Sequence, residues 1–254
     1  MKLKNSAYIL LLSLSLSLSG CASNPQNQAD PNDPYQAFNR SMFNFNHGFY
    51  TYVGNPLNDV YTTITPGFAR TGARNFFRNL NTAPGLANDM LQWNWRYFGK
   101  DLARLLLNST LGLFGLFDVA GSSGIPWHPQ GFSYTLAKWG YAQSNYLVLP
   151  ILGPSTVSDT IGLGVDTVSS PLFYVSPIWV RNTLGGEYFV QKSSDVLPQY
   201  NLIMKTALDP YIALKEAYLQ NRAYNIEQIK YDGNVPASKQ ALNDNIDSAS
   251  TSPP

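Results

Sequence analysis

Cys21 is the only cysteine of the 254 residues, and its surroundings are typical of a site of lipid attachment. It follows Leu18-Ser19-Gly20, small residues of the kind that precede the acylated cysteine of the bacterial lipobox. Lys2 and Lys4 open the chain, and the apolar stretch that comes next is shorter than the roughly 20 residues of a membrane-spanning helix. We therefore expect a signal peptide over residues 1–20 and acylation of Cys21. The alternative is an ordinary small buried cysteine.

Acylation of Cys21 determines where the protein works. Two acyl chains suffice for stable attachment to a membrane. Ala22 takes the place of the aspartate that retains lipoproteins in the inner membrane, so we expect a lipid anchor on the periplasmic face of the bacterial outer membrane. Residues 21–32 and 232–254 are polar, which predicts a flexible acylated tether and a disordered tail on either side of one folded domain, 33–231.

Two groups of basic side chains have a spacing that could bind anions. Within each group the residues are four apart, so each group follows one side of a helix. We interpret them as a basic ridge for phospholipid headgroups or for an acidic partner protein, with plain solvated helix faces as the alternative. Without residues 1–20 the chain has 15 basic and 16 acidic residues, which argues against a nucleic-acid partner. The six residues are Arg70, Arg74, Arg78, Arg96, Lys100 and Arg104.

Residues for catalysis are scarce. The chain has two histidines, His47 and His128, and no G-x-S-x-G motif, metal-ligand spacing or nucleotide-binding loop. For both histidines we favour a structural or interfacial role. We expect no enzymatic activity, no metal and no cofactor.

The segment 105–180 contains only four charged residues, where the average composition of 13% would give about ten. A surface that meets water keeps charge, so this depletion predicts contact with hydrocarbon. An unusually buried core is the alternative. The candidate channel-lining or bilayer-contacting residues are Leu111, Leu113, Phe114, Leu116 and Phe117.

The periodicity predicts a mostly α-helical fold. We expect helices to begin at Asp33-Pro34, Thr65-Pro66, Thr82-Ala83-Pro84, Ser176-Pro177 and Asp209-Pro210. In the first helix an aromatic stripe (Phe38, Met42, Phe45, Phe49) favours a core-facing side over a lipid-contacting one. In the last helix, Tyr211, Leu214, Tyr218 and Ile229 share a side. The best candidate strand is 146–149, which Pro150 ends.

An ordered set of motifs resembles the MlaA (VacJ) lipoproteins. Residues 33–46, DPYQAFNRSMFNFN, are similar to the opening D-P-x-x-x-F-N-R-x-M-[FY]-x-F-N of that family, and further blocks follow in the same order through 104–121, 132–136, 146–150 and 209–218. The residues that carry the resemblance include Phe38, Asn39, Arg40, Asn44, Phe45, Asn108, Gly112 and Asp118.

The resemblance implies a single ring-like helical domain in the inner leaflet of the outer membrane, with a central amphipathic channel and no cofactor. It implies removal of mislocalised phospholipids from the outer leaflet and their transfer to a periplasmic lipid-carrier protein, with possible association with a trimeric porin. The alternative is a structural or adaptor lipoprotein that docks a porin or other envelope partner without conducting lipid.

Overall fold

Residues 33–231 are the part of the chain that the computed structural model describes, and they are mostly helical, as the periodicity predicts. The signal peptide 1–20, Cys21, the tether and the tail 232–254 lie outside the described residues. The elements are α2 (Gln36–Phe49), η1 (Tyr50–Gly54), α3 (Asn55–Ile64), α4 (Gly67–Leu91), α5 (Trp95–Thr110), α6 (Val119–Ser122), α7 (Phe132–Leu136), η2 (Ala137–Tyr141), β1 (Tyr146–Leu149), β2 (Gly153–Thr156), α8 (Val157–Ser169), η3 (Pro171–Tyr174), α9 (Ile178–Thr206) and α10 (Pro210–Lys230).

Most of the predicted helix starts are confirmed. The Asp209 carboxylate accepts hydrogen bonds from the backbone N–H groups of Tyr211 and Ile212, which otherwise lack partners in the first turn of α10. Helices α4 and α9 begin directly after Pro66 and Pro177. The predicted strand 146–149 is β1, which pairs antiparallel with β2.

The predicted helix start at Thr82-Ala83-Pro84 is wrong, because α4 continues through Pro84. The Thr82 hydroxyl does not cap a new helix; it donates to the carbonyl of Arg78, one turn earlier in the same helix. Asn88 donates a side-chain hydrogen bond to the carbonyl of Pro84, in the last two turns of α4. A proline inside a helix costs stability, and packing of α4 against α5 and α9 offsets this local cost.

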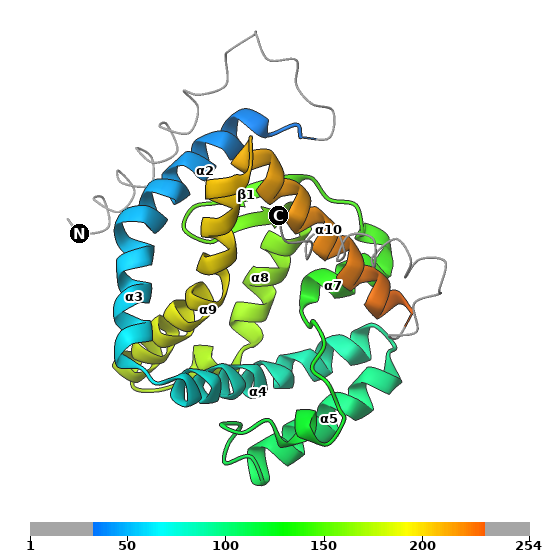
Figure 1. Ribbon diagram of the computed structural model, residues 1–254. Helices are drawn as coiled ribbons and strands as arrows, with labels where there is room; N and C mark the ends of the chain where they lie inside the picture. Colours follow the sequence, from blue (N-terminus) through cyan, green and yellow to red (C-terminus); the bar gives the residue numbers. More distant parts are fainter. Residues whose placement is uncertain (1–32, 232–254) are drawn as a thin grey trace, which may run out of the picture.

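The long helices run around the outside of the molecule and α8 lies inside their outline (Figure 1). Helices α2 and α3 form one continuous side, and α4 crosses the end that they reach, next to α5. Helix α9 contacts α3, α4 and α10, so it links helices from the two halves of the described residues. Among the described residues, no helix is both long and apolar enough to cross a bilayer.

The largest apolar cluster is small and lies where α2, β1 and α10 meet. Its buried members are Phe43, Tyr146, Val148 and Tyr211. Met42, Leu214 and Tyr218 pack against it, which confirms that Tyr211, Leu214 and Tyr218 of α10 share an inward side.

A buried polar network fixes the same junction. The Asn39 side chain donates to the Asp33 carboxylate (2.9 Å) and to the Tyr146 carbonyl (3.1 Å), and it accepts from the Val148 N–H (2.9 Å). The hydroxyl of Tyr211 donates to the other carboxylate oxygen of Asp33. One asparagine thereby connects the start of the body, α2 and β1, and Asp33 extends this network to α10.

The aromatic stripe of α2 faces the core only in part, which corrects the interpretation that the sequence favours: Met42 packs against the core cluster, but Phe38 and Phe45 do not. The exposed fractions of Phe38 and Phe45 are 40% and 51%. The buried residues of α2 are Asn39, Phe43 and Asn46, one position further along the helix. Asparagines take the inward positions because the helix packs on the backbone of the β1–β2 hairpin, whose polar groups need partners; Asn46 bonds to the carbonyl of Leu149 and the N–H of Ile151.

We expect Asn39→Ala to lower the free energy of unfolding by about 2–3 kcal/mol, because it leaves buried partners without hydrogen bonds. Asn44→Ala is the matched control: Asn44 lies in the same helix, is exposed, and gains the same helix propensity. Chemical denaturation in mild detergent measures both. Equal destabilisation of the two variants would show that the Asn39 network does not hold the junction.

Candidate functional site

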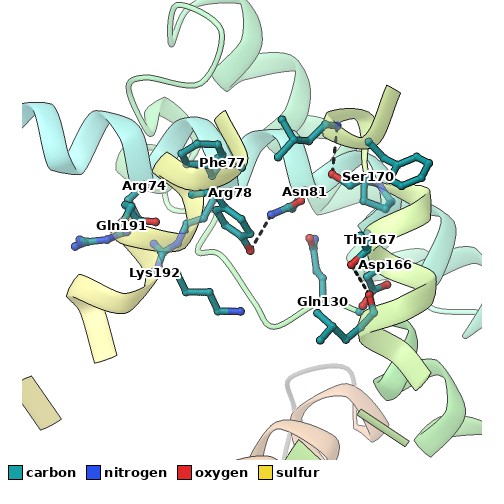
Figure 2. Close-up of a pocket in the computed structure, with 18 of the residues that line it drawn as sticks. Arg74, Phe77, Arg78, Asn81, Gln130, Asp166, Thr167, Ser170, Gln191 and Lys192 are labelled. Carbon is teal, nitrogen blue, oxygen red and sulfur yellow. Dashed lines mark hydrogen bonds between the residues drawn. The ribbon is translucent and has the colours of Figure 1, made fainter. Parts of the chain in front are cut away.

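A cavity of about 770 Å³ lies between α4, α8 and α9 and is closed on one side by the loop before α7. Figure 2 shows its walls: Arg74, Phe77 and Arg78 come from α4, Gln191 and Lys192 from α9, and Asp166 and Thr167 from α8 on the opposite side. The segments that form it are separated by up to about 120 residues in sequence, so the tertiary fold alone creates the space.

The wall formed by α4 and α9 is basic. Nε of Arg74 lies 3.0 Å from a carboxylate oxygen of Asp195, so this charge is paired. Arg78 lies over the ring of Trp127, with Cζ 5.0 Å from the ring centroid. Burial, followed by the neighbouring Arg74 guanidinium, lowers the pKa of Arg78. Within residues 33–231 no carboxylate forms an ion pair with Arg78 or Lys192, so both can engage an anion in the cavity.

The rest of the lining is mixed. Apolar contacts come from Phe77, Leu163, Leu172 and Phe173. Asp166 on α8 accepts a hydrogen bond from the Phe132 N–H (3.0 Å), and burial raises the pKa of this carboxyl group. A space with cations on one wall and hydrocarbon nearby suits an amphipathic molecule that bears an anionic group.

Two glycines let the loop before α7 approach the helices. A Cβ on Gly85 of α4 would lie 2.4 Å from the side chain of Gln130. Gly131 has a φ of 148°, and a Cβ there would lie 2.8 Å from Asp166. A larger residue at Gly85 would displace the Gln130 amide, and one at Gly131 would both displace the Asp166 carboxylate and strain the backbone.

The six basic residues of the predicted ridge do not act together. Arg74 and Arg78 line the cavity, whereas Arg70 lies near the start of α4 and is not among the lining residues. Arg96 is exposed and Lys100 is half-buried on α5, away from the cavity.

Arg104 corrects the prediction of a headgroup contact, because its side chain is buried. It pairs with Asp118 at 3.0 Å and donates to the carbonyl of Ile125. Burial alone raises the pKa of Asp118, but hydrogen bonds from the Gly121 N–H and Asn108, together with the Arg104 guanidinium, lower it. This pair of a buried arginine and a half-buried aspartate holds the turn between α5 and α6.

Lys192 and Arg181 also line the cavity, although the spacing of the basic residues did not predict this. They lie 11 residues apart on α9, which is three helical turns, so they share a side of that helix. The spacing was visible in the sequence, but nothing in it indicates that this side faces the Arg74 side of α4.

The segment 111–117 lies on the surface between α5 and α6. The exposed fractions of its large side chains run from 45% to 78%, so the alternative of a buried core is excluded for this segment. Leu113, Phe114 and Gly115 all have positive φ, and the Gly115 N–H donates to the Asn108 carbonyl (2.7 Å). A Cβ on Gly115 would lie 2.5 Å from Asn79, so the glycine lets the loop sit tightly on α4 while its apolar side chains point outward. Those side chains are Leu111, Leu113, Phe114, Leu116 and Phe117.

The residues of the family motif fall into two groups: those that hold elements of the fold together and those that lie on the surface. Asn39, Arg40, Asn108 and Asp118 make hydrogen bonds that join elements, with Arg40 paired to Asp209 at 2.8 Å. Gly112 is buried, and a Cβ on it would lie 2.3 Å from the Phe117 carbonyl oxygen. Phe38, Asn44 and Phe45 are exposed.

The two histidines have different surroundings. Nδ1 of His47 lies 3.3 Å from the hydroxyl of Tyr200. His128 is buried and its ring stacks on Tyr97 at 3.9 Å. It faces the carboxylates of Asp89 and Asp101, whose pKa values burial raises, while burial lowers the pKa of His128 itself.

Comparison with known proteins agrees with the motif resemblance. Residues 31–225 match the family described as MlaA lipoprotein. The "Intermembrane phospholipid transport system lipoprotein MlaA" of Escherichia coli (strain K12) is 32% identical over 254 residues, which cover 97% of this chain and 98% of the relative. An "uncharacterized protein" of Rickettsia felis is 36% identical over 200 residues, covering 77% and 78% of the two chains.

A solved structure from a study named "Structural basis for maintenance of bacterial outer membrane lipid asymmetry" has the same fold, with a TM-score of 0.67 and 29% identity. The match covers 76% of this chain and 98% of the other. Family match, relatives and fold agree over the body of the protein. The chain therefore belongs to the MlaA lipoprotein family.

Proposed function

We propose that this chain is an outer-membrane lipoprotein that moves mislocalised phospholipids out of the outer leaflet and maintains lipid asymmetry. The observation that carries the proposal is the amphipathic cavity, which combines basic and apolar lining in about 770 Å³. The name of the Escherichia coli relative and the subject of the study of the similar solved structure both concern this activity.

The cavity serves as part of the lipid path in this proposal. A phospholipid phosphate carries a negative charge, and Arg78 and Lys192 offer cations for it at the α4–α9 wall. Phe77, Leu163 and Phe173 offer apolar surface for the start of the acyl chains. We propose that this space belongs to a central amphipathic channel that the helices surround like a ring.

The exterior suits a protein embedded in one leaflet. Large apolar side chains are exposed on α2, η1, α3, α4 and the loop 111–117, with Tyr52, Ile64, Phe68 and Phe114 each at least 72% exposed. Trp93 and Trp95 are also exposed, and tryptophan favours the depth of the headgroups. With the acyl chains on Cys21, these surfaces would hold the body at the periplasmic leaflet of the outer membrane.

Transfer of a lipid breaks no covalent bond, so we propose that the chain is a transporter component and not an enzyme. The lipid leaves the cavity for a periplasmic lipid-carrier protein, and a trimeric porin is a candidate partner within the membrane. An adaptor role without lipid passage would apply if the purified protein captured an outer-membrane partner but held no phospholipid.

We expect Arg78→Glu combined with Lys192→Glu to lower the amount of copurifying phospholipid about tenfold, because two attractive charges become repulsive to phosphate. Lipid extraction and mass spectrometry on the protein in mild detergent measure this. Lys205→Glu, on an exposed position of α9 outside the cavity, is the matched control. Equal lipid content in all three proteins would contradict the assignment of the cavity.

We expect Leu113→Arg to leave secretion intact and to raise phospholipid in the outer leaflet of cells that depend on this protein, because a charge in the exposed apolar loop opposes its insertion into hydrocarbon. Leu208→Arg, at a fully exposed leucine between α9 and α10, is the control. Labelling of outer-leaflet phospholipid is the readout. Unchanged asymmetry with Leu113→Arg would count against bilayer contact by this loop.

A further inference from the structure

A second polar cluster lies outside the cavity, where α4, α5 and the loop after α6 meet. Asp89 comes from α4, Asp101 from α5 and His128 from the loop. The exposed fractions of their side chains are 4%, 1% and 11%. The proposed lipid path does not use these three groups.

The cluster has the geometry of a ligand set. Nδ1 of His128 lies 3.4 Å from Oδ1 of Asp101, and Nε2 lies 3.8 Å from Oδ1 of Asp89. One potential ligand atom from each residue lies within 4.8 Å of the other two.

Three atoms of the cluster are buried without a hydrogen-bond partner among the described residues: Oδ2 of Asp89, Oδ1 of Asp101 and Nδ1 of His128. Buried polar atoms are almost always paired, because an unpaired one costs free energy. Asp101 in particular is almost fully buried and directs its unpaired oxygen at the imidazole.

Among residues 33–231, no lysine or arginine forms an ion pair with the two carboxylates, which interact with His128 and with each other. Arg104 is already paired with Asp118. Gln130, which is neutral, donates to the other oxygen of Asp101. The Lys100 ammonium lies over the ring of Tyr97, with Nζ 5.4 Å from the ring centroid. The ring of Tyr97 also stacks on His128 and holds the plane of the imidazole.

We propose that Asp89, Asp101 and His128 bind a divalent transition-metal ion of the zinc class. Carboxylate oxygen and imidazole nitrogen both bind Zn²⁺ at about 2.0–2.2 Å, so ligand atoms around one ion lie at most about 4 Å apart. The three ligand atoms lie within 4.8 Å of one another, so they would have to move closer together around the ion, which only one nitrogen of His128 would bind. The imidazole favours zinc over Mg²⁺ and Ca²⁺, which prefer oxygen ligands.

The ion would join α5 to two segments that carry parts of the cavity wall. Helix α4 contributes Arg78 to the lining, and the loop contributes Trp127 and Gln130, the latter bonded directly to Asp101. Metal binding would therefore fix the loop against α4. The proposal concerns the ion alone and does not depend on phospholipid transport.

The zinc content of the full chain tests the proposal. The protein is purified in mild detergent with an affinity tag that lacks histidine. It is then treated with chelator and dialysed against Zn²⁺. We expect about one ion per chain by inductively coupled plasma mass spectrometry. Competition with a chromophoric chelator should give at least about tenfold weaker binding for Asp101→Asn and for His128→Gln. His47→Gln, which alters the only other histidine, should bind as the unaltered chain does.

Nuclear magnetic resonance of the histidine side chains supplies a readout that needs no cluster variant to fold. Zn²⁺ should shift one of the two imidazole signals of the unaltered protein, the one that persists in His47→Gln. Absence of bound zinc in the unaltered chain, a shift of the His47 signal instead, or equal loss of zinc in His47→Gln would overturn the proposal.

Discussion

The fold depends on hydrogen bonds and ion pairs between polar groups in the interior, because many of the large apolar side chains lie on the surface instead of in a core. Among residues 33–231, more of the fully buried residues are polar or charged than hydrophobic, and many large hydrophobic residues are exposed. A buried polar group without a partner destabilises the folded state, so each inward asparagine, aspartate or arginine needs a specific partner. Asn39 joins α2 to β1, Arg104 joins α5 to α6, and Arg222 joins α10 to α8 through Asp159.

This constraint explains how an exterior rich in exposed apolar side chains and a polar cavity coexist in one domain. Polar side chains that are paired with one another leave the outward faces of α2 and α3 free to be apolar. Polar and irregular backbone is tolerated at membrane depth where it faces protein or a water-filled space. The 770 Å³ cavity between α4, α8 and α9 provides such a space, and Gly85 and Gly131 allow its wall to close.

The two clearest errors of the sequence analysis have the same cause. Helical periodicity shows that Phe38, Met42, Phe45 and Phe49 share a side, but it does not show whether water, protein or hydrocarbon lies next to that side. Arg104 likewise shares a spacing with Arg96 and Lys100, yet Asp118, 14 residues later, folds back and removes its charge from the surface. In both cases the sequence did not show what packs against the side chains in the folded protein.

The sequence alone determined the helical class, most of the helix starts, the strand 146–149 and the family, because these depend on residues that are close in the chain or on motifs in order. It also indicated that 111–117 is unusual, since charge depletion is a property of composition. Only the tertiary structure decided which cations face the cavity, that Arg181 and Lys192 meet the α4 wall, and that Asp89, Asp101 and His128 converge. Those juxtapositions depend on how helices distant in sequence pack together, and no local pattern specifies that.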